Sequence, residues 1–272
     1  MNKQKRSAKS RTKPGQRVIA LLTDFGDRDH YVGTMKGVIL SIHPGARIID
    51  LSNNVTPRNV HEAGYLLWAS YKYFPEHTVF VCVVDPGVGS DRRIVCLETG
   101  RHQFIAPDNG LLDFILLLEK AVGLYEIDNP PRFGTNPPST TFHGRDIFAP
   151  LAAHLSMGRS VKVFGKRRAL NKPSPVFCTP EAGVGIARIL HVDRFGNLIT
   201  NIPEEYFEPI TLKVGNTRIA QHIRRYVEGP DAQPCLILGS SGLIEVVVKN
   251  GSAAKMLGVD AGTQITVVSG RK

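Results

Sequence analysis

The sequence predicts an α/β fold in which an N-terminal wound α/β domain precedes a small C-terminal β-barrel-like domain. Two patterns predict it. Short apolar runs alternate with helical segments as far as residue 155, which is typical of strands and helices wound into one sheet. From residue 183 onward short β-rich runs dominate, and the proline-rich segment between the two parts is the predicted linker.

The elements of the first domain follow from two kinds of apolar spacing. Short apolar runs bounded by turn residues predict buried strands, whereas apolar residues on one helical face, such as Val32, Met35 and Ile39, predict helices. The expected strands are 18–22, 47–51, 79–84, 102–106 and 123–127, and the expected helices are 31–43, 61–74, one from 111, and 144–155.

The second domain is predicted from β-rich runs alone. These runs are 186–192, 198–202, 210–214, 235–238, 243–248 and 264–268. The resulting organisation is a disordered basic tail (1–16), an α/β domain (17–168), a linker (169–182) and a β domain (183–272).

The net charge of +10 is concentrated at the start of the chain, because the first 17 residues hold seven cations and no acid. Of 34 cations, 27 therefore remain against 24 acids, so the folded part is nearly neutral. The tail lacks aromatic residues and periodicity, which favours a solubilising arm over a nucleic-acid-binding arm. With no apolar span and no signal peptide, the sequence predicts a cytoplasmic protein without membrane contact.

The four cysteines are scattered, without a Cys-x-x-Cys pair or a nearby histidine. Cys82 and Cys235 lie within strand-like runs, where cysteine behaves as a small apolar residue. The sequence therefore predicts no structural zinc site.

Polar side chains follow several of the predicted strands. Asp24 comes after the first strand, Asp85 after the third, and Asp108-Asn109 after a later one. Each alone is compatible with a cap or a turn. Ligands of open α/β sheets bind at the carboxyl ends of the strands, so several such residues at one edge predict a ligand site.

The segment from Asp85 to Arg92 combines a carboxylate, two glycines and a guanidinium at a strand exit. A phosphate loop is disfavoured because no Gly-Lys-Ser/Thr follows and the carboxylate would repel an anion. His143 opens the last helix, whose N-terminus disfavours the protonated ring. A neutral imidazole can accept a proton from water, although a hydrogen-bonded structural histidine is the alternative.

Five motifs occur in order along the chain. They are Leu22–Gly26, Val84–Gly89 with Arg92-Arg93, Ala106–Gly110, Thr141–Asp146 and Asp193–Asn201. Together they resemble the S-adenosyl-L-methionine hydrolase family, also called SAM hydroxide adenosyltransferases, which is related to the fluorinase and chlorinase. The resemblance extends over about residues 17–270.

The resemblance implies that water or hydroxide attacks C5′ of S-adenosylmethionine (SAM) and releases adenosine and L-methionine, with no metal or redox cofactor. It assigns water activation to Asp85, Arg92 and His143, and leaves open whether Asp85 or His143 takes the proton. It also implies a homotrimer whose sites lie between the α/β domain of one chain and the β domain of its neighbour.

The resemblance further implies a set of substrate contacts. Asp24 corresponds to the residue that holds the ribose hydroxyls, Asp193 to the contact with the methionine amino group, and Asn197 to the adenine contact. The other candidate substrate-binding residues are Asp108, Asn109, Ser240 and Ser241, of which the two serines lie where relatives bind the methionine carboxylate. The halogenase pattern has an arginine in place of the second serine.

Two alternatives remain. A halogenase is disfavoured because Asp85 stands where the fluorinase has a tyrosine, and a carboxylate would repel a halide. In addition, the link from Arg93 to His102 is too short for the inserted loop of the halogenases. A non-catalytic SAM or adenosine sensor would not need the water-activating set, which is present.

Overall fold

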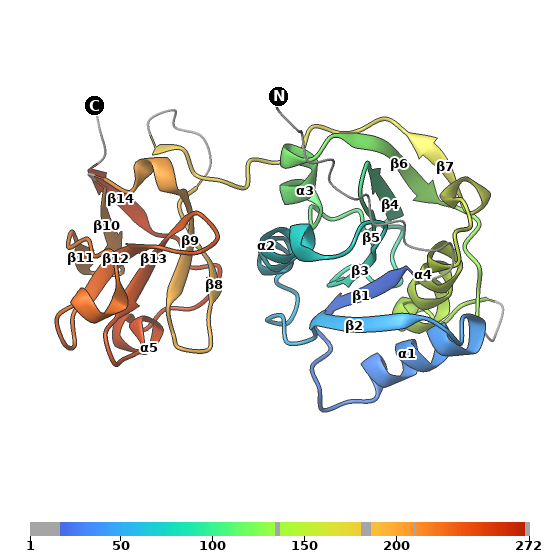
Figure 1. The fold of residues 1–272 in the computed structure, drawn as a ribbon, viewed down its shortest axis with the longest axis horizontal. Coiled ribbons are helices and arrows are strands. Elements are labelled where there is room, and N and C mark those ends of the chain that lie inside the picture. The colour runs from blue at the N-terminus through green and yellow to red at the C-terminus, as the bar shows by residue number, and fades with distance from the viewer. Residues whose placement is uncertain (1–16, 134–136, 181–185, 209, 270–272) are drawn as a thin grey trace, which may run out of the picture. The chain divides into compact units, whose positions relative to one another are not determined.

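The computed structural model describes residues 17–133, 137–180, 186–208 and 210–269 (Figure 1). The chain forms two compact units, each built from segments that are distant in sequence. Unit 1 comprises Met1–Asn53, Tyr73–Pro107 and Lys120–Leu170, and unit 2 comprises Asn54–Lys72, Asp108–Glu119 and Asn171–Lys272. The predicted disordered tail and the end of the predicted linker lie outside the described residues.

Unit 1 is built on a seven-stranded mixed sheet in the order β2-β1-β3-β5-β4-β6-β7. Its strands are β1 (Val18–Thr23), β2 (Arg47–Ser52), β3 (Val79–Val83), β4 (Ile94–Thr99), β5 (Gln103–Pro107), β6 (Ala121–Ile127) and β7 (Gly165–Arg168). The four neighbouring strands β2, β1, β3 and β5 run parallel to one another. β4 pairs antiparallel with β5 and with β6, and β6 pairs antiparallel with β7. The carboxyl ends of β1, β3 and β5 therefore share one edge.

One face of this sheet is covered by α1 (Tyr31–Ile42) and α4 (Ala149–Ser156), which also pack against each other (Figure 1). Met35 and Ile39 of α1 are fully buried, as is Leu151 of α4. Burial of each such side chain contributes about 1.5–3 kcal/mol, so this layer fixes α1 and α4 firmly on the sheet.

Three local features of unit 1 differ from the sequence expectation. β7 (Gly165–Arg168) lies where no strand was predicted. The link between Arg93 and His102 contains β4, which the sequence analysis missed. The predicted helix 144–155 begins with one π-helical turn, Gly144–Phe148, before α4. Pro150 explains the widened turn, because proline has no N–H to donate to the carbonyl of residue 146 and its ring crowds that carbonyl.

Unit 2 contains two antiparallel sheets, in the orders β12-β13-β9-β8 and β11-β10-β14. Its strands are β8 (Ile189–Val192), β9 (Leu198–Pro203), β10 (Thr211–Val214), β11 (Thr217–Ile219), β12 (Pro234–Leu238), β13 (Leu243–Val248) and β14 (Thr266–Ser269). Its helices are α2 (Val60–Ser70), α3 (Asp113–Leu118) and α5 (Ala253–Leu257). The antiparallel β structure after the α/β part confirms the predicted fold class; β11 and α5 were not expected.

Short 3₁₀ turns connect several of these elements, at Tyr71–Tyr73, Val161–Val163, Glu204–Tyr206 and Tyr226–Glu228. In the part of the chain that the structure describes, none of the helices is long and apolar enough to cross a membrane.

Candidate active site

Three predicted site residues directly or shortly follow strands that end at the carboxyl edge of the unit 1 sheet: Asp24 after β1, Asp85 after β3 and Asp108 after β5. Thr23 is in register with Val83, so Asp24 directly after β1 and Asp85 shortly after β3 lie at the same edge. The turn that carries Asp24 is tied to the end of β2, since Thr23 Oγ1 hydrogen-bonds Asn53 Oδ1 at 3.0 Å. This agrees with the sequence expectation for the edge.

Asp85, Arg92 and His143 come together in unit 1. Arg92 donates to Asp85 Oδ2 from both Nε (2.8 Å) and Nη2 (2.6 Å). The same Nη2 lies 2.6 Å from His143 Nδ1. The guanidinium thus bridges the carboxylate and the imidazole, and the side chains of Asp85 and Arg92 are only 5% and 13% exposed.

The backbone around the trio explains how distant segments meet. Gly89 has a φ of +81°, and a Cβ there would overlap the carbonyl oxygen of Thr140. The loop after Asp85 therefore packs directly on the segment that leads into His143. Glycine has no Cβ and no steric penalty at positive φ, so Gly89 allows the loop after Asp85 to approach the segment before His143 this closely.

His143 is held in one protonation state by its neighbours. Arginine has donors and no acceptor, so Nδ1 of His143 must accept from Arg92, and the ring proton resides on Nε2. Burial, followed by the positive charge of Arg92, lowers the pKa of His143 from its ordinary 6.5, against opposing effects of Asp85 and Asp146. The ring is therefore neutral at pH 7, as expected from sequence, although burial and Arg92 are the main causes.

One carboxylate oxygen of Asp85 accepts no hydrogen bond from the described residues. Oδ2 takes both bonds from Arg92, whereas Oδ1 is buried without a hydrogen-bond partner among the described residues. An orphaned buried carboxylate oxygen is costly in a folded protein. The arrangement is that of an acceptor kept available for an incoming O–H group.

In unit 2, Asp193 and Asn197 form a tight turn between β8 and β9. Asp193 Oδ1 accepts from the backbone N–H of Phe195 and of Asn197, both at 2.9 Å. Its Oδ2 accepts from the Asn197 side-chain amide at 2.8 Å. The sequence reasoning identified both residues, and the structure gives them a shared, rigid geometry.

This turn borders a cavity of about 900 Å³ within unit 2. The lining residues are Asp193, Phe195, Asn197, Tyr226, Val227, Val248, Lys249, Asn250 and Gly251. Phe195 is 76% exposed and Val227 is 71% exposed. Exposed apolar side chains gathered around a hollow with a few polar groups are typical of a site for a small organic ligand.

Glu245 is a polar residue near this cavity that the sequence analysis missed. It is buried in β13, and its Oε2 accepts from the hydroxyl of Tyr226 at 3.3 Å. Burial first, and the negative charge of Asp193 second, raise the pKa of Glu245. A single acid within the otherwise apolar run Leu243–Val248 was the signal that could have revealed it.

The remaining predicted contacts also lie in unit 2. Asn109 Oδ1 accepts from the backbone N–H of Leu111 at 3.2 Å, so its side chain closes the turn before α3, next to Asp108. Ser240 and Ser241 occupy the turn between β12 and β13. Their contacts with a substrate stay a prediction.

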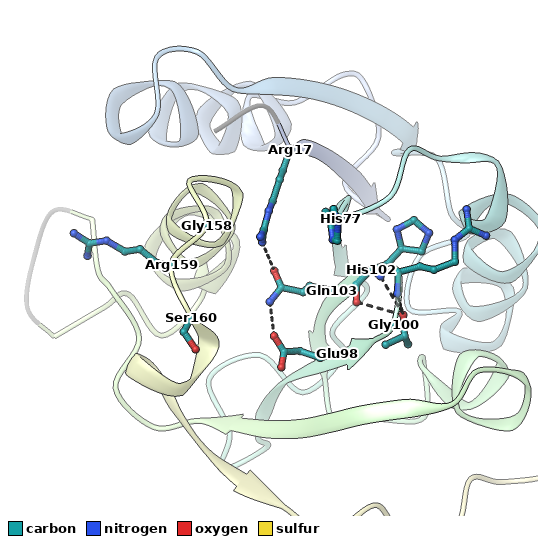
Figure 2. A pocket seen from close by; sticks show the side chains of 11 residues that line it. Arg17, His77, Glu98, Gly100, His102, Gln103, Gly158, Arg159 and Ser160 are labelled. Atoms are coloured by element: carbon teal, nitrogen blue, oxygen red, sulfur yellow. Dashed lines mark hydrogen bonds between the residues drawn. The ribbon is translucent and has the colours of Figure 1, made fainter. Parts of the chain in front are cut away.

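A second cavity, of about 240 Å³, lies at the opposite edge of the unit 1 sheet, where β1 and β5 begin (Figure 2). Arg17 donates to Gln103 Oε1 (3.4 Å) and to the carbonyl of Leu155 (3.2 Å), and Gln103 donates to Glu98 (2.7 Å). These polar groups satisfy one another and hold the start of β1. The six residues of β1, each rising about 3.3 Å along the strand, separate this cavity from the edge of the sheet that carries Asp24.

Among the described residues, no three histidine, cysteine or acidic side chains are placed to hold a metal ion. The four cysteines are buried free thiols.

Comparisons with known proteins agree with one another. Residues 19–165 match the N-terminal domain of SAM hydroxide adenosyltransferases, and residues 187–266 match the C-terminal domain. A Thermus thermophilus protein named (R)-S-adenosyl-L-methionine hydrolase is 36% identical over 265 residues, which cover 93% of this chain and 100% of the relative.

A fluorinase of an Actinoplanes species is 32% identical over 220 residues, which cover 69% of this chain and 72% of the relative. Among solved structures, an uncharacterized conserved protein from Thermotoga maritima superposes with a TM-score of 0.80 at 35% identity, covering 92% of this chain and 99% of that one.

Proposed function

This chain belongs to the SAM hydroxide adenosyltransferase family, and from that premise we propose that it hydrolyses SAM to adenosine and L-methionine. One observation carries the proposal within the structure. Arg92 bridges Asp85 and His143 while leaving Asp85 Oδ1 buried and open, which is the arrangement needed to hold one water molecule and accept its proton.

In the proposed reaction, the water oxygen forms a bond to C5′ as the C5′–S bond breaks, and the bonding electron pair leaves with the sulfur. The sulfonium becomes a neutral thioether, so the departing methionine needs no acid. The attacking oxygen becomes strongly acidic as it bonds to carbon, and a carboxylate of ordinary strength can then take its proton. Asp85 Oδ1 is the acceptor, and such general-base assistance is worth about 10²- to 10⁴-fold.

His143 has a different task in this mechanism. Its Nδ1 is occupied by Arg92 and its Nε2 already carries a proton, so the ring has no free acceptor. The imidazole instead fixes the guanidinium and offers one N–H donor to the water. This favours Asp85 over His143 as the group that takes the proton, with Arg92 fixing the carboxylate's orientation.

Substrate binding is proposed to use both units. Asp24 would accept hydrogen bonds from the ribose hydroxyls, as acidic residues do in other nucleotide-binding sheets. Asp193 would bind the methionine ammonium, and Asn197 with Phe195 beside it would contact adenine. Asp108, Asn109, Ser240 and Ser241 would complete the contacts. We further propose a homotrimer, with sites between neighbouring chains, that needs no metal or redox cofactor and does not bind nucleic acid.

Halogenation of SAM is disfavoured by the same carboxylate. A halide nucleophile carries a negative charge, and the buried Asp85 at the proposed nucleophile position would repel it. Water is neutral and can hydrogen-bond to Oδ1.

The direct test is incubation of the purified protein with SAM alone, followed by chromatography of the products. Adenosine and methionine in equal amounts are expected, in proportion to the amount of protein. Parallel reactions with added fluoride or chloride should give the same product. A halogenated adenosine would instead identify a halogenase, and binding of SAM without turnover would identify a sensor.

A further inference from the structure

The motif that contains His143 ends in Arg145 and Asp146, which the proposed mechanism does not use. Asp146 is 1% exposed, and it lies in the π-helical turn that follows His143. A carboxylate in such a position is costly unless each of its oxygens is hydrogen-bonded. Asp146 therefore needs a hydrogen-bond donor on each of its oxygens.

Asp146 is bound on two sides. Arg145 donates to its Oδ1 from Nε (2.6 Å) and to its Oδ2 from Nη2 (2.9 Å). The backbone N–H of Ser139 donates to Oδ2 at 2.8 Å, across seven residues of chain. Asp146 therefore closes the loop from Ser139 to His143 onto the start of the helix.

The same loop contacts the loop that follows Asp85, and this contact brings His143 close to Asp85 and Arg92. Thr140, next to Ser139, presents its carbonyl oxygen against Gly89, in the loop that follows Asp85. Arg145 also lies over the ring of Phe142, with 5.4 Å between the guanidinium carbon and the ring centroid. The loop is thus held at three points, by Asp146 at Ser139, by Arg145 at Phe142, and by the close approach of Gly89 to Thr140.

We infer that Asp146, clamped by Arg145, is a positioning residue that sets the place of His143, and through it of Arg92, for the attack of water on SAM. This inference rests on the proposed hydrolysis for its catalytic consequence. Its structural consequence, the pinning of the loop 139–143, is independent of turnover.

The test compares Asp146→Asn with the wild type and with Asp128→Asn. Asp128 is a matched control, because it forms an exposed ion pair with Lys166 in the same unit. An asparagine at 146 has one acceptor oxygen. At the place of Oδ2 that oxygen accepts from Ser139 and from Arg145 Nη2 while the N–H₂ group opposes Arg145 Nε, and in the turned-over orientation the bond from Ser139 is lost. The loop should loosen, and displacement of a catalytic group by about 1 Å can lower the rate about 100-fold.

For Asp146→Asn we expect kcat to fall about 10- to 100-fold with KM for SAM nearly unchanged. The acid limb of the kcat profile should move to lower pH, because the charge of Asp146 joins that of Asp85 in favouring a protonated His143, against Arg92. Amide hydrogen exchange at Ser139 should also accelerate, because the contact between two donors, the asparagine amide and Arg145 Nε, weakens the bond from Ser139 in one orientation, and the other orientation lacks that bond. Asp128→Asn should change none of these quantities.

The inference is wrong if Asp146→Asn keeps the wild-type kcat, or if exchange at Ser139 stays slow in that variant. It is also wrong if the kcat of Asp146→Asn falls while its acid limb stays at the wild-type pH, and Asp128→Asn shows the same fall in kcat. If the wild-type protein itself forms no adenosine, the proposed function fails, and the exchange measurement still decides whether Asp146 pins the loop.

Discussion

Replacement of Asp85 by asparagine is the most informative perturbation of the proposed site. An asparagine has the same shape as aspartate but only one acceptor oxygen. If that oxygen stays on Arg92, the amide N–H₂ occupies the place of Oδ1 and cannot take a proton. If the amide is turned over, its N–H₂ faces the donors of Arg92, and the bridge to His143 is lost. Neither orientation keeps both functions.

Both consequences have a magnitude. Loss of the general base predicts a decline in kcat of about 10²- to 10⁴-fold. The ion pair is buried, and breaking such a pair costs about 3–5 kcal/mol. The lower end applies when the asparagine oxygen stays on Arg92, because Arg92 then keeps its contact with His143. A loss of about 3 kcal/mol corresponds to a Tm lower by roughly 6 °C.

The assay is adenosine formation at saturating SAM, measured beside thermal unfolding, with Asp128→Asn as the control for loss of an exposed pair. A folded Asp85→Asn protein with kcat within about threefold of the wild type would refute the role of Asp85, since general-base assistance is worth at least about 10²-fold.

Three further predictions concern the same site. Acidification should abolish activity only below pH 6.5, because the pKa of His143 is lowered and the protonated ring cannot accept from Arg92. His143→Gln should remove this acid limb from the pH profile. An unchanged limb in that variant would contradict its assignment to His143. Gly89→Ala should lower kcat and stability, because its Cβ would overlap Thr140, whereas Gly158→Ala, at a φ of +87° in open space, should cost only about 1 kcal/mol of strain and keep full activity. Equal activity of the two alanine variants would show that the Gly89 contact is unimportant. Removal of the basic tail should leave kcat and KM unchanged, since it joins β1 at the edge opposite Asp24; loss of activity on truncation would argue for a role in catalysis.

The strand exits were predictable because β1 and β3 are short, fully buried runs followed at once by a polar turn. That pattern is local in the sequence, and it is enough to place Asp24 and Asp85 at one edge of the sheet. The meeting of Asp85 with His143 followed from the motifs, whereas their bridging through Arg92 did not. It depends on the close approach of two loops at Gly89, and the glycine alone does not indicate which distant segment packs against it.

Other features were hidden for identifiable reasons. β4 lies within what the sequence suggested was only a link, and its antiparallel pairing with β5 needs a tight turn at Gly100. The π-helical turn after His143 results from Pro150 interrupting a helix whose apolar spacing is otherwise regular. Glu245 was masked by the apolar residues on either side of it, since periodicity alone assigns that run to a buried strand.

The origin of the oxygen in the product tests the central claim most directly. The purified protein is incubated with SAM in water enriched in the heavy oxygen isotope, and both products are analysed by mass spectrometry. Attack of water on C5′ predicts adenosine that carries one heavy oxygen atom on C5′ and methionine that carries none. Adenosine without the label, or no adenosine at all, would contradict the account.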